Sequence, residues 1–212
     1  MRRVALLAIL AAILCVPAAG SAATSAKSWL SVAAAQLPEL QVETAGPMTG
    51  YSRAKFGPAW QDVDHNGCDT RNDILKRDLR FKVFKAGDDC VIQKGTLHDP
   101  YTGTTIHFVR GVGTSAAVQI DHIVALAAAW RSGAKAWTAA RRLAYANDPI
   151  VLLAVDGPSN EAKGDDDAAQ WLPPKKSYDC RYAARQIAIK TKYDLSLTKP
   201  EHDTMKILLA GC

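Results

Sequence analysis

The sequence predicts an α+β domain closed by two disulfides, and three observations lead to this prediction. Short segments rich in β-branched residues lie in the middle of the 212-residue chain, where strands are expected. Segments with apolar residues at helical spacing precede, interrupt and follow them. Beyond the first 23 residues the chain has four cysteines, an even number that suggests disulfides.

The strands are predicted from local patterns and turn residues. Residues 90–92 are one candidate, and 104–110 are another because they follow the turn Asp99-Pro-Tyr-Thr-Gly103. A third strand is expected at 118–123. A fourth is expected at 150–155, where an apolar run ends at Asp156-Gly-Pro158.

The helices follow from the 3.6-residue periodicity. Ile74, Leu75 and Leu79 share one face of a helix expected at 70–80. An alanine-rich helical excursion is expected at 126–146, and a further helix begins near Ser159. Two C-terminal helices are expected at 178–193 and 200–210, and Thr198 with Glu201 forms a capping box for the last one.

The N-terminus has the pattern of an export signal. A basic start, an apolar stretch at 4–16 and small residues at 18–23 predict a signal peptide at 1–23. The apolar stretch is too short for a membrane-spanning helix, so we expect a secreted protein with no stable membrane anchor after cleavage. Residues 24–50 are predicted to be a linker, with a short helix at 25–36, and 51–212 to be the folded domain.

The four remaining cysteines allow three disulfide pairings. Their spacing favours Cys68–Cys90 and Cys180–Cys212, one local bridge in each half of the domain. A zinc site made of these cysteines would need close C-x-x-C pairs, which this sequence lacks.

The formal net charge of +5 falls to +3 without Arg2 and Arg3 (5 minus 2), which is compatible with a polyanionic partner. Two groups of basic residues could contact a nucleic-acid backbone. The alternative is that they are solvent-exposed faces with no such role. They are Arg131, Lys135, Arg141 and Arg142, then Lys175, Lys176, Arg181 and Arg185.

One constellation carries chemistry. Asp121-His122 lies on a predicted strand, Asn147 precedes the next strand, and Asn160 and Lys163 open the following helix. A histidine that titrates near neutrality can take a proton from water. Carboxylate and amide oxygens suit magnesium or manganese better than zinc. One carboxylate and one amide form a weak site alone, so substrate and water would have to complete the shell.

The same segments resemble the HNH nuclease motif, in the variant with Asn at its last position. They read Gln119-Ile-Asp-His-Ile-Val-Ala-Leu, Asn147-Asp-Pro-Ile-Val-Leu-Leu and Asn160-Glu-Ala-Lys-Gly164. Residues 51–212 are similar to small secreted bacterial HNH-family proteins, related to the nuclease domain of modification-dependent restriction enzymes. That similarity includes Tyr51-Ser-Arg-Ala-Lys-Phe-Gly, Gly67-Cys-Asp-Thr-Arg-Asn-Asp and Trp171-Leu-Pro-Pro.

The resemblance implies a ββα-metal core and a metal-dependent endonuclease acting on nucleic acid, with DNA as the favoured substrate and RNA as the alternative. Asp121 and Asn160 match the metal ligands and His122 the general base. Asn147 matches the residue that braces the histidine loop, and Lys163 the basic residue near the phosphate. The long separation of His122 from Asn147 and the absence of zinc-knuckle cysteines depart from the family pattern.

Three further interpretations stay open. Asp62, Asp64, Asn66 and Asp73 have the spacing of a calcium loop, and an Asx-rich turn is the alternative. The protein could also be a secreted, non-catalytic module that binds nucleic acid or the cell envelope, or a phosphodiesterase for another polymer.

Overall fold

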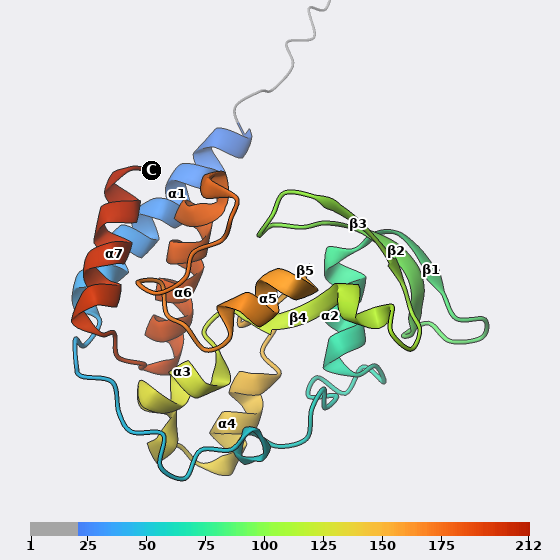
Figure 1. The fold of residues 1–212 in the computed structure, drawn as a ribbon, viewed down its shortest axis with the longest axis horizontal. Helices are drawn as coiled ribbons and strands as arrows, with labels where there is room; N and C mark the ends of the chain where they lie inside the picture. Colours follow the sequence, from blue (N-terminus) through green and yellow to red (C-terminus); the bar gives the residue numbers. More distant parts are fainter. Residues whose placement is uncertain (1–20) are drawn as a thin grey trace, which may run out of the picture.

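The computed structural model describes residues 21–212, with side chains from residue 29 onward (Figure 1). The predicted signal peptide lies outside the described residues except for its last three. Within the described part, no helix is long and apolar enough to cross a membrane.

Two antiparallel sheets form the β-part of the fold. The first has the order β1-β2-β3, with β1 Arg80–Phe84, β2 Ile92–His98 and β3 Thr105–Val109. The second pairs β4 Val118–His122 with β5 Leu152–Asp156, and Val118 lies opposite Asp156. Helix α2, Thr70–Asp78, lies between the two sheets (Figure 1). One core cluster joins these elements; it contains Ile74, Leu75, Leu79, Ile92, Leu97, Phe108, Ile120 and Leu152.

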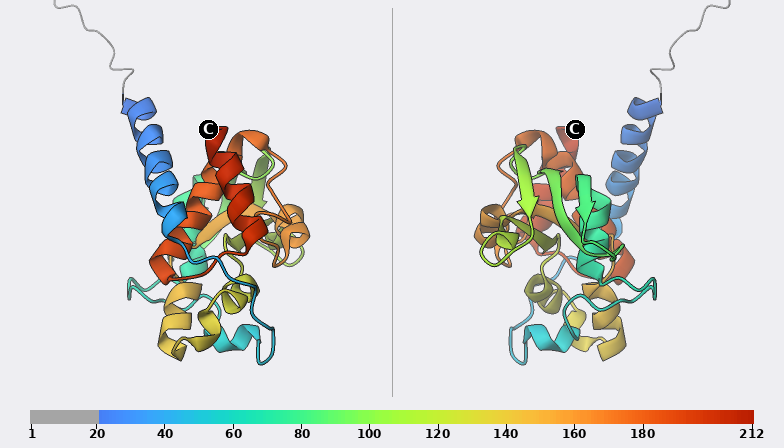
Figure 2. Two further views of the ribbon diagram at one scale, coloured as in Figure 1. Left: turned by 90° about the vertical axis from the view of Figure 1, so that its left-hand side faces the viewer. Right: turned by 90° about the vertical axis from the view of Figure 1, so that its right-hand side faces the viewer.

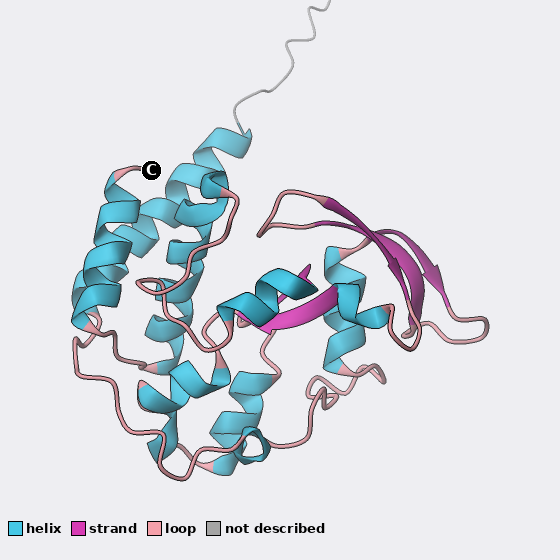
Figure 3. Cartoon of the chain, viewed as in Figure 1, coloured by secondary structure: helices cyan, strands magenta, loops and turns pink. Residues whose placement is uncertain are grey.

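The remaining helices gather on the other side of β4 and β5 (Figure 3). They are α3 Leu126–Arg131, α4 Ala139–Ala146, α6 Asp179–Tyr193 and α7 Lys199–Ala210. A larger core beneath them is rich in aromatic residues, with Tyr101, Tyr145 and Tyr182 fully buried. Each of these rings makes edge-on or tilted aromatic contacts, an arrangement that stabilises the core beyond area burial alone.

The structure confirms the α+β class and most predicted elements, with local shifts. The strand expected at 90–92 begins at Ile92 and continues to His98. The excursion at 126–146 is two short helices, because Gly133 between them has a φ of 131°. The predicted capping box of Thr198 and Glu201 is present at the start of α7.

The N-terminal segment contains the short helix predicted at 25–36. Helix α1, Ser21–Gln36, lies along α6, and Ala33 and Leu37 are buried (Figure 2). The Glu43 amide donates to the Leu197 carbonyl, so the chain after the helix also contacts the domain. Part of the predicted linker therefore contacts the domain, while the linker at 24–50 and a domain boundary at residue 50 stay predictions.

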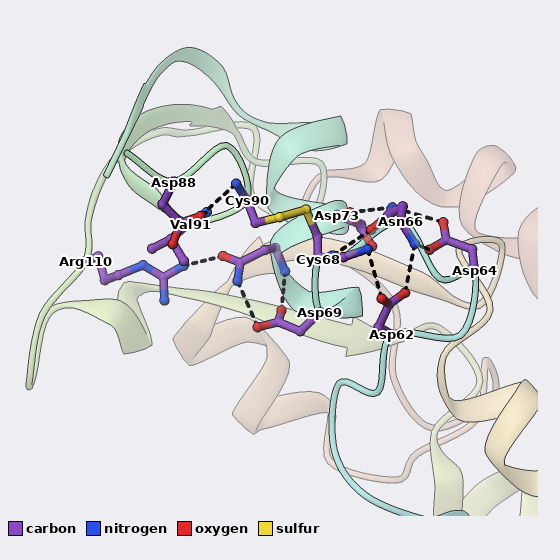
Figure 4. The surroundings of a disulfide bond; sticks show 12 residues. Asp62, Asp64, Asn66, Cys68, Asp69, Asp73, Asp88, Cys90, Val91 and Arg110 are labelled. Carbon is purple, nitrogen blue, oxygen red and sulfur yellow. Dashed lines mark hydrogen bonds between the residues drawn. A yellow bond between two sulfur atoms is a disulfide. The ribbon is translucent and has the colours of Figure 1, made fainter. Parts of the chain in front are cut away.

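Both predicted disulfides form. Cys68–Cys90 joins the loop before α2 to the start of β2, with the Cα atoms 5.2 Å apart (Figure 4). Cys180–Cys212 joins the start of α6 to the C-terminus, with the Cα atoms 5.9 Å apart. Each bridge restrains the end of a helix that packs against a core.

Candidate functional site

Strand β4 carries Asp121 and His122 into the interior, where they are only 4% and 6% exposed. Helix α5, Gly157–Lys163, follows β5 directly and returns across β4. A Cβ atom on Gly157 would lie 2.1 Å from the Ala116 carbonyl oxygen, so the close approach of α5 to the start of β4 requires glycine. This turn brings Asn160 and Lys163 of α5 close to the Asp121-His122 pair of β4.

Asp121 is held by two buried side chains. The Lys163 ammonium donates to Asp121 Oδ1 over 2.7 Å and to the His122 carbonyl over 2.9 Å. The Tyr101 hydroxyl donates to Asp121 Oδ2 over 2.5 Å. A buried carboxylate needs such partners because desolvation penalises an unpaired charge. The side chain of Lys163 is fully buried, so the structure places it against Asp121 rather than at the surface expected of a phosphate contact.

Tyr101 is a residue of the site that sequence analysis missed. Burial and the neighbouring Asp121 carboxylate raise the pKa of Tyr101 well above its usual value, so the hydroxyl remains a donor. Asp99 fixes the turn that carries Tyr101 by accepting from the Thr102 amide and from the Asp156 amide. The sequence predicted the turn at 99–103, but no local pattern showed that its tyrosine is buried at the site rather than exposed on the surface.

His122 has the hydrogen bonding of a neutral base. Its Nε2 lies 2.9 Å from the Ala146 carbonyl oxygen, which can only accept, so Nε2 carries the proton and Nδ1 keeps its lone pair. Burial lowers the pKa of His122 to about 4, against a smaller raising effect of the Ala146 hydrogen bond and Asp121. No group in the described part of the chain bonds to Nδ1, so this atom is free to accept a proton.

Asn147 lies next to the carbonyl that orients His122. It caps the end of α4, and its Nδ2 donates to the Leu143 carbonyl over 3.0 Å. Its Oδ1 is buried and has no hydrogen-bond partner among the residues described. This position suits the predicted bracing role, which remains a prediction.

Asn160 lies beside β4 on the first turns of α5. Its Nδ2 donates to Gln119 Oε1 over 2.8 Å, and Gln119 Nε2 donates to Glu161 Oε1 over 2.7 Å. This network leaves Asn160 Oδ1 without a bond to any side chain in the described range. Asn160, Asp121 and His122 all line one cavity of about 460 Å³, which we call the polar cavity.

The oxygens around the polar cavity fit a divalent ion only in part. Asp121 and Asn160 offer the carboxylate and amide oxygens that magnesium and manganese prefer. Within residues 21–212, however, no group of three or more His, Cys, Asp or Glu side chains could hold a metal ion, and Lys163 already neutralises Asp121. This donor set would hold an ion only if substrate and water completed the shell, and metal binding stays a prediction.

Comparison with known proteins adds the family. The C-terminal domain of GmrSD restriction endonucleases matches residues 69–206, well over half of the chain. The chain belongs to this family. The match covers all five candidate residues. It supports the predicted nuclease family, whereas the HNH type stays a prediction. No solved structure matches the chain.

A fungal relative of this GmrSD-family chain is named an uncharacterized secreted protein, from Arthroderma benhamiae (strain ATCC MYA-4681 / CBS 112371). It is 38% identical over 185 residues, which cover 86% of this chain and 85% of the relative. That name and the two disulfides confirm the predicted secretion. This relative is fungal, so the predicted resemblance to a bacterial group of proteins is not confirmed.

The acidic loop of the GmrSD-family chain is a hydrogen-bonded turn (Figure 4). Asp62 accepts from the Gly67 amide over 2.9 Å, and Asn66 Nδ2 donates to Asp64 and Asp73 over 3.1 and 3.2 Å. The four predicted ligands therefore do come together, but their oxygens bind the amides of the loop itself. Calcium binding at this loop stays a prediction.

Most of the predicted basic groups have structural partners. Arg131 pairs with Asp165 and Arg141 with Asp194, while Arg185 donates to backbone carbonyls. Arg53 was not among the predicted basic residues, although it lies in the segment Tyr51-Ser-Arg-Ala-Lys-Phe-Gly. It is exposed, lines the polar cavity beside His122, and forms no hydrogen bond or ion pair with any described residue.

Proposed function

We propose that this protein is a metal-dependent endonuclease of the HNH type, which hydrolyses phosphodiester bonds of nucleic acid, DNA rather than RNA. The observation that carries the proposal is the state of His122. Its Nε2 proton is donated to a backbone carbonyl, which leaves Nδ1 without a partner among the described residues, and His122 lines a cavity together with Asp121 and Asn160. Strands β4 and β5 with helix α5 would be the ββα core.

His122 would act as the general base through Nδ1. Because burial keeps its pKa near 4, the ring is neutral at neutral pH and can take a proton from a water molecule. The oxygen of that water forms a bond to phosphorus as the bond to the leaving oxygen breaks, and the leaving oxygen gains a proton. Lys163 and Tyr101 would hold Asp121 in a single orientation during this step.

Asp121 and Asn160 would hold one magnesium or manganese ion. The ion would supply neutralisation of charge on the phosphate and the leaving oxygen. Asn147 would keep the Ala146 carbonyl in place and so fix the tautomer of His122.

A secreted, non-catalytic binding module is the alternative. It would not need a buried, low-pKa histidine at the wall of a polar cavity, since such a group costs stability below neutral pH. The retained Asp121, His122 and Asn160 set therefore favours catalysis.

The test is cleavage of supercoiled plasmid by the mature protein with magnesium, manganese or EDTA. We expect metal-dependent nicking that His122→Ala lowers by about 100- to 10,000-fold and that Asn160→Ala also lowers. His98→Ala is the matched control, because His98 is exposed on the other sheet. No nicking with any divalent ion by a folded, disulfide-intact sample would refute the proposal and favour the binding module.

A further inference from the structure

A second cavity adjoins His122 and has a different character from the polar cavity. It has a volume of about 240 Å³ and shares Arg53, His122 and Leu126 with the polar cavity. The rest of its wall is mostly apolar; it includes Phe56, Gly57, Pro58, Trp60, Ala146 and Asn147. We call it the apolar cavity. Any group bound in the polar cavity at His122 therefore has an apolar space close by.

Trp60 forms an aromatic wall of the apolar cavity. Its ring is partly exposed and nearly parallel to the His122 ring, with 18° between the planes and 6.2 Å between the centroids. Its φ of 61° is a left-handed conformation that bulky residues rarely adopt. Such strain persists where the surroundings impose it and is common at binding sites.

Arg53 lies where the two cavities meet. The short helix η2, Arg53–Phe56, carries it, and Phe56 is 1% exposed and packs against Trp130 and Tyr145. The base of the helix is thus fixed while the Arg53 side chain has no partner in the described structure. A guanidinium with free donors next to the general base suits a phosphate.

Asn147 is a polar residue among the residues that line this mostly apolar cavity. The residue is 1% exposed, and its Oδ1 has no hydrogen-bond partner among residues 21–212. A buried acceptor without a partner is costly. A ligand with an amino or imino hydrogen would relieve this cost, and a purely apolar ligand would not.

We propose that the apolar cavity is the subsite for one nucleobase, that of a nucleotide flanking the scissile phosphate. Trp60 stacks on the base, Arg53 binds the adjoining phosphate, and Asn147 Oδ1 accepts from the base. This inference rests on the proposed nuclease function and adds a substrate preference to it.

The size of the cavity determines that preference. Its volume of about 240 Å³ lies below the range of pockets for drug-sized ligands, so it suits one ring system and not a base pair. The base must therefore leave its stack, which costs least in a single strand or at an unpaired position. Single-stranded or locally unpaired DNA is the substrate class that follows.

The first test is binding without catalysis. In EDTA, the anisotropy of a fluorescein-labelled single-stranded oligonucleotide would be measured with wild type and Trp60→Leu. We expect Trp60→Leu to weaken binding about 10- to 100-fold, the range for loss of one base stack. Phe81→Leu is the control, since Phe81 is 82% exposed on β1, away from the site. Equal affinity of wild type and Trp60→Leu would contradict the subsite.

The second test uses the wild-type protein only, so it does not depend on how Trp60→Leu folds. An abasic spacer is moved along a single-stranded substrate, and kcat/KM is measured for cleavage at each site with magnesium. We expect a loss of about 10- to 100-fold when the spacer flanks the scissile phosphate, and no loss farther away. Cleavage that ignores the spacer would overturn this inference alone. Absence of cleavage of every DNA would overturn the proposed function and the inference with it.

Discussion

Replacing His122 by glutamine should change how the stability of the metal-free protein depends on pH. Burial lowers the pKa of His122 from 6.5 to about 4 in the folded chain. Below pH 6.5 the unfolded chain gains a proton that the folded chain does not, so unfolding becomes easier as the pH falls. The stability is fully present above 6.5 and is lost progressively down to about 4. A difference of about 2.5 units corresponds to about 3 kcal/mol.

The assay is urea unfolding followed by far-UV circular dichroism in EDTA, from about pH 7 down to about pH 4. We expect wild type to lose about 3 kcal/mol more than His122→Gln over this interval, because glutamine does not titrate but can still donate to Ala146. His98→Gln is the control at an exposed position. Parallel curves for wild type and His122→Gln would refute the buried, neutral histidine on which the general base depends.

Three further predictions concern the framework of the site. Lys163→Met leaves a buried carboxylate without its cation, so the free energy of unfolding should fall by about 3–5 kcal/mol; a loss under about 1 kcal/mol would contradict the buried pair. Replacing both Cys180 and Cys212 by serine opens a bridge with a sequence separation of 32 and should cost about 3–4 kcal/mol by denaturant unfolding; an unchanged midpoint would argue against the bridge. Gly57→Ala places a Cβ atom 2.6 Å from a leucine of α4 at a φ of 86°, so it should destabilise by about 1–3 kcal/mol. Gly87→Ala is also at positive φ but in open space, so it should lower the free energy of unfolding less than Gly57→Ala does. Both variants are compared by denaturant unfolding, and equal losses would rule out the steric explanation.

Local patterns predicted most of the elements and the covalent framework. The helical face at 70–80, the strand at 118–123 and the capping box of α7 each depend on neighbours within a few residues, which the chain records directly. The disulfide pairing was also accessible, because few residues separate the partners. The contacts of the segment 24–50 were not accessible from the sequence, because an alanine- and serine-rich segment has the same composition whether it packs against α6 or not.

Asp121, His122, Asn147 and Asn160 were identified from the sequence as one set, and the structure brings three of them to one cavity. The order of the two strands and the helix that carry this set follows from the sequence without the structure.

Only the folded structure shows which charged side chains are paired inside the protein and which are available to bind a ligand. Lys163 and Tyr101 bond to Asp121 from 42 and 20 residues away, and Arg53, beside His122, forms no hydrogen bond or ion pair with any residue that the structure describes. The physical reason is that desolvation depends on every element packed around a side chain, and no local pattern records that burial.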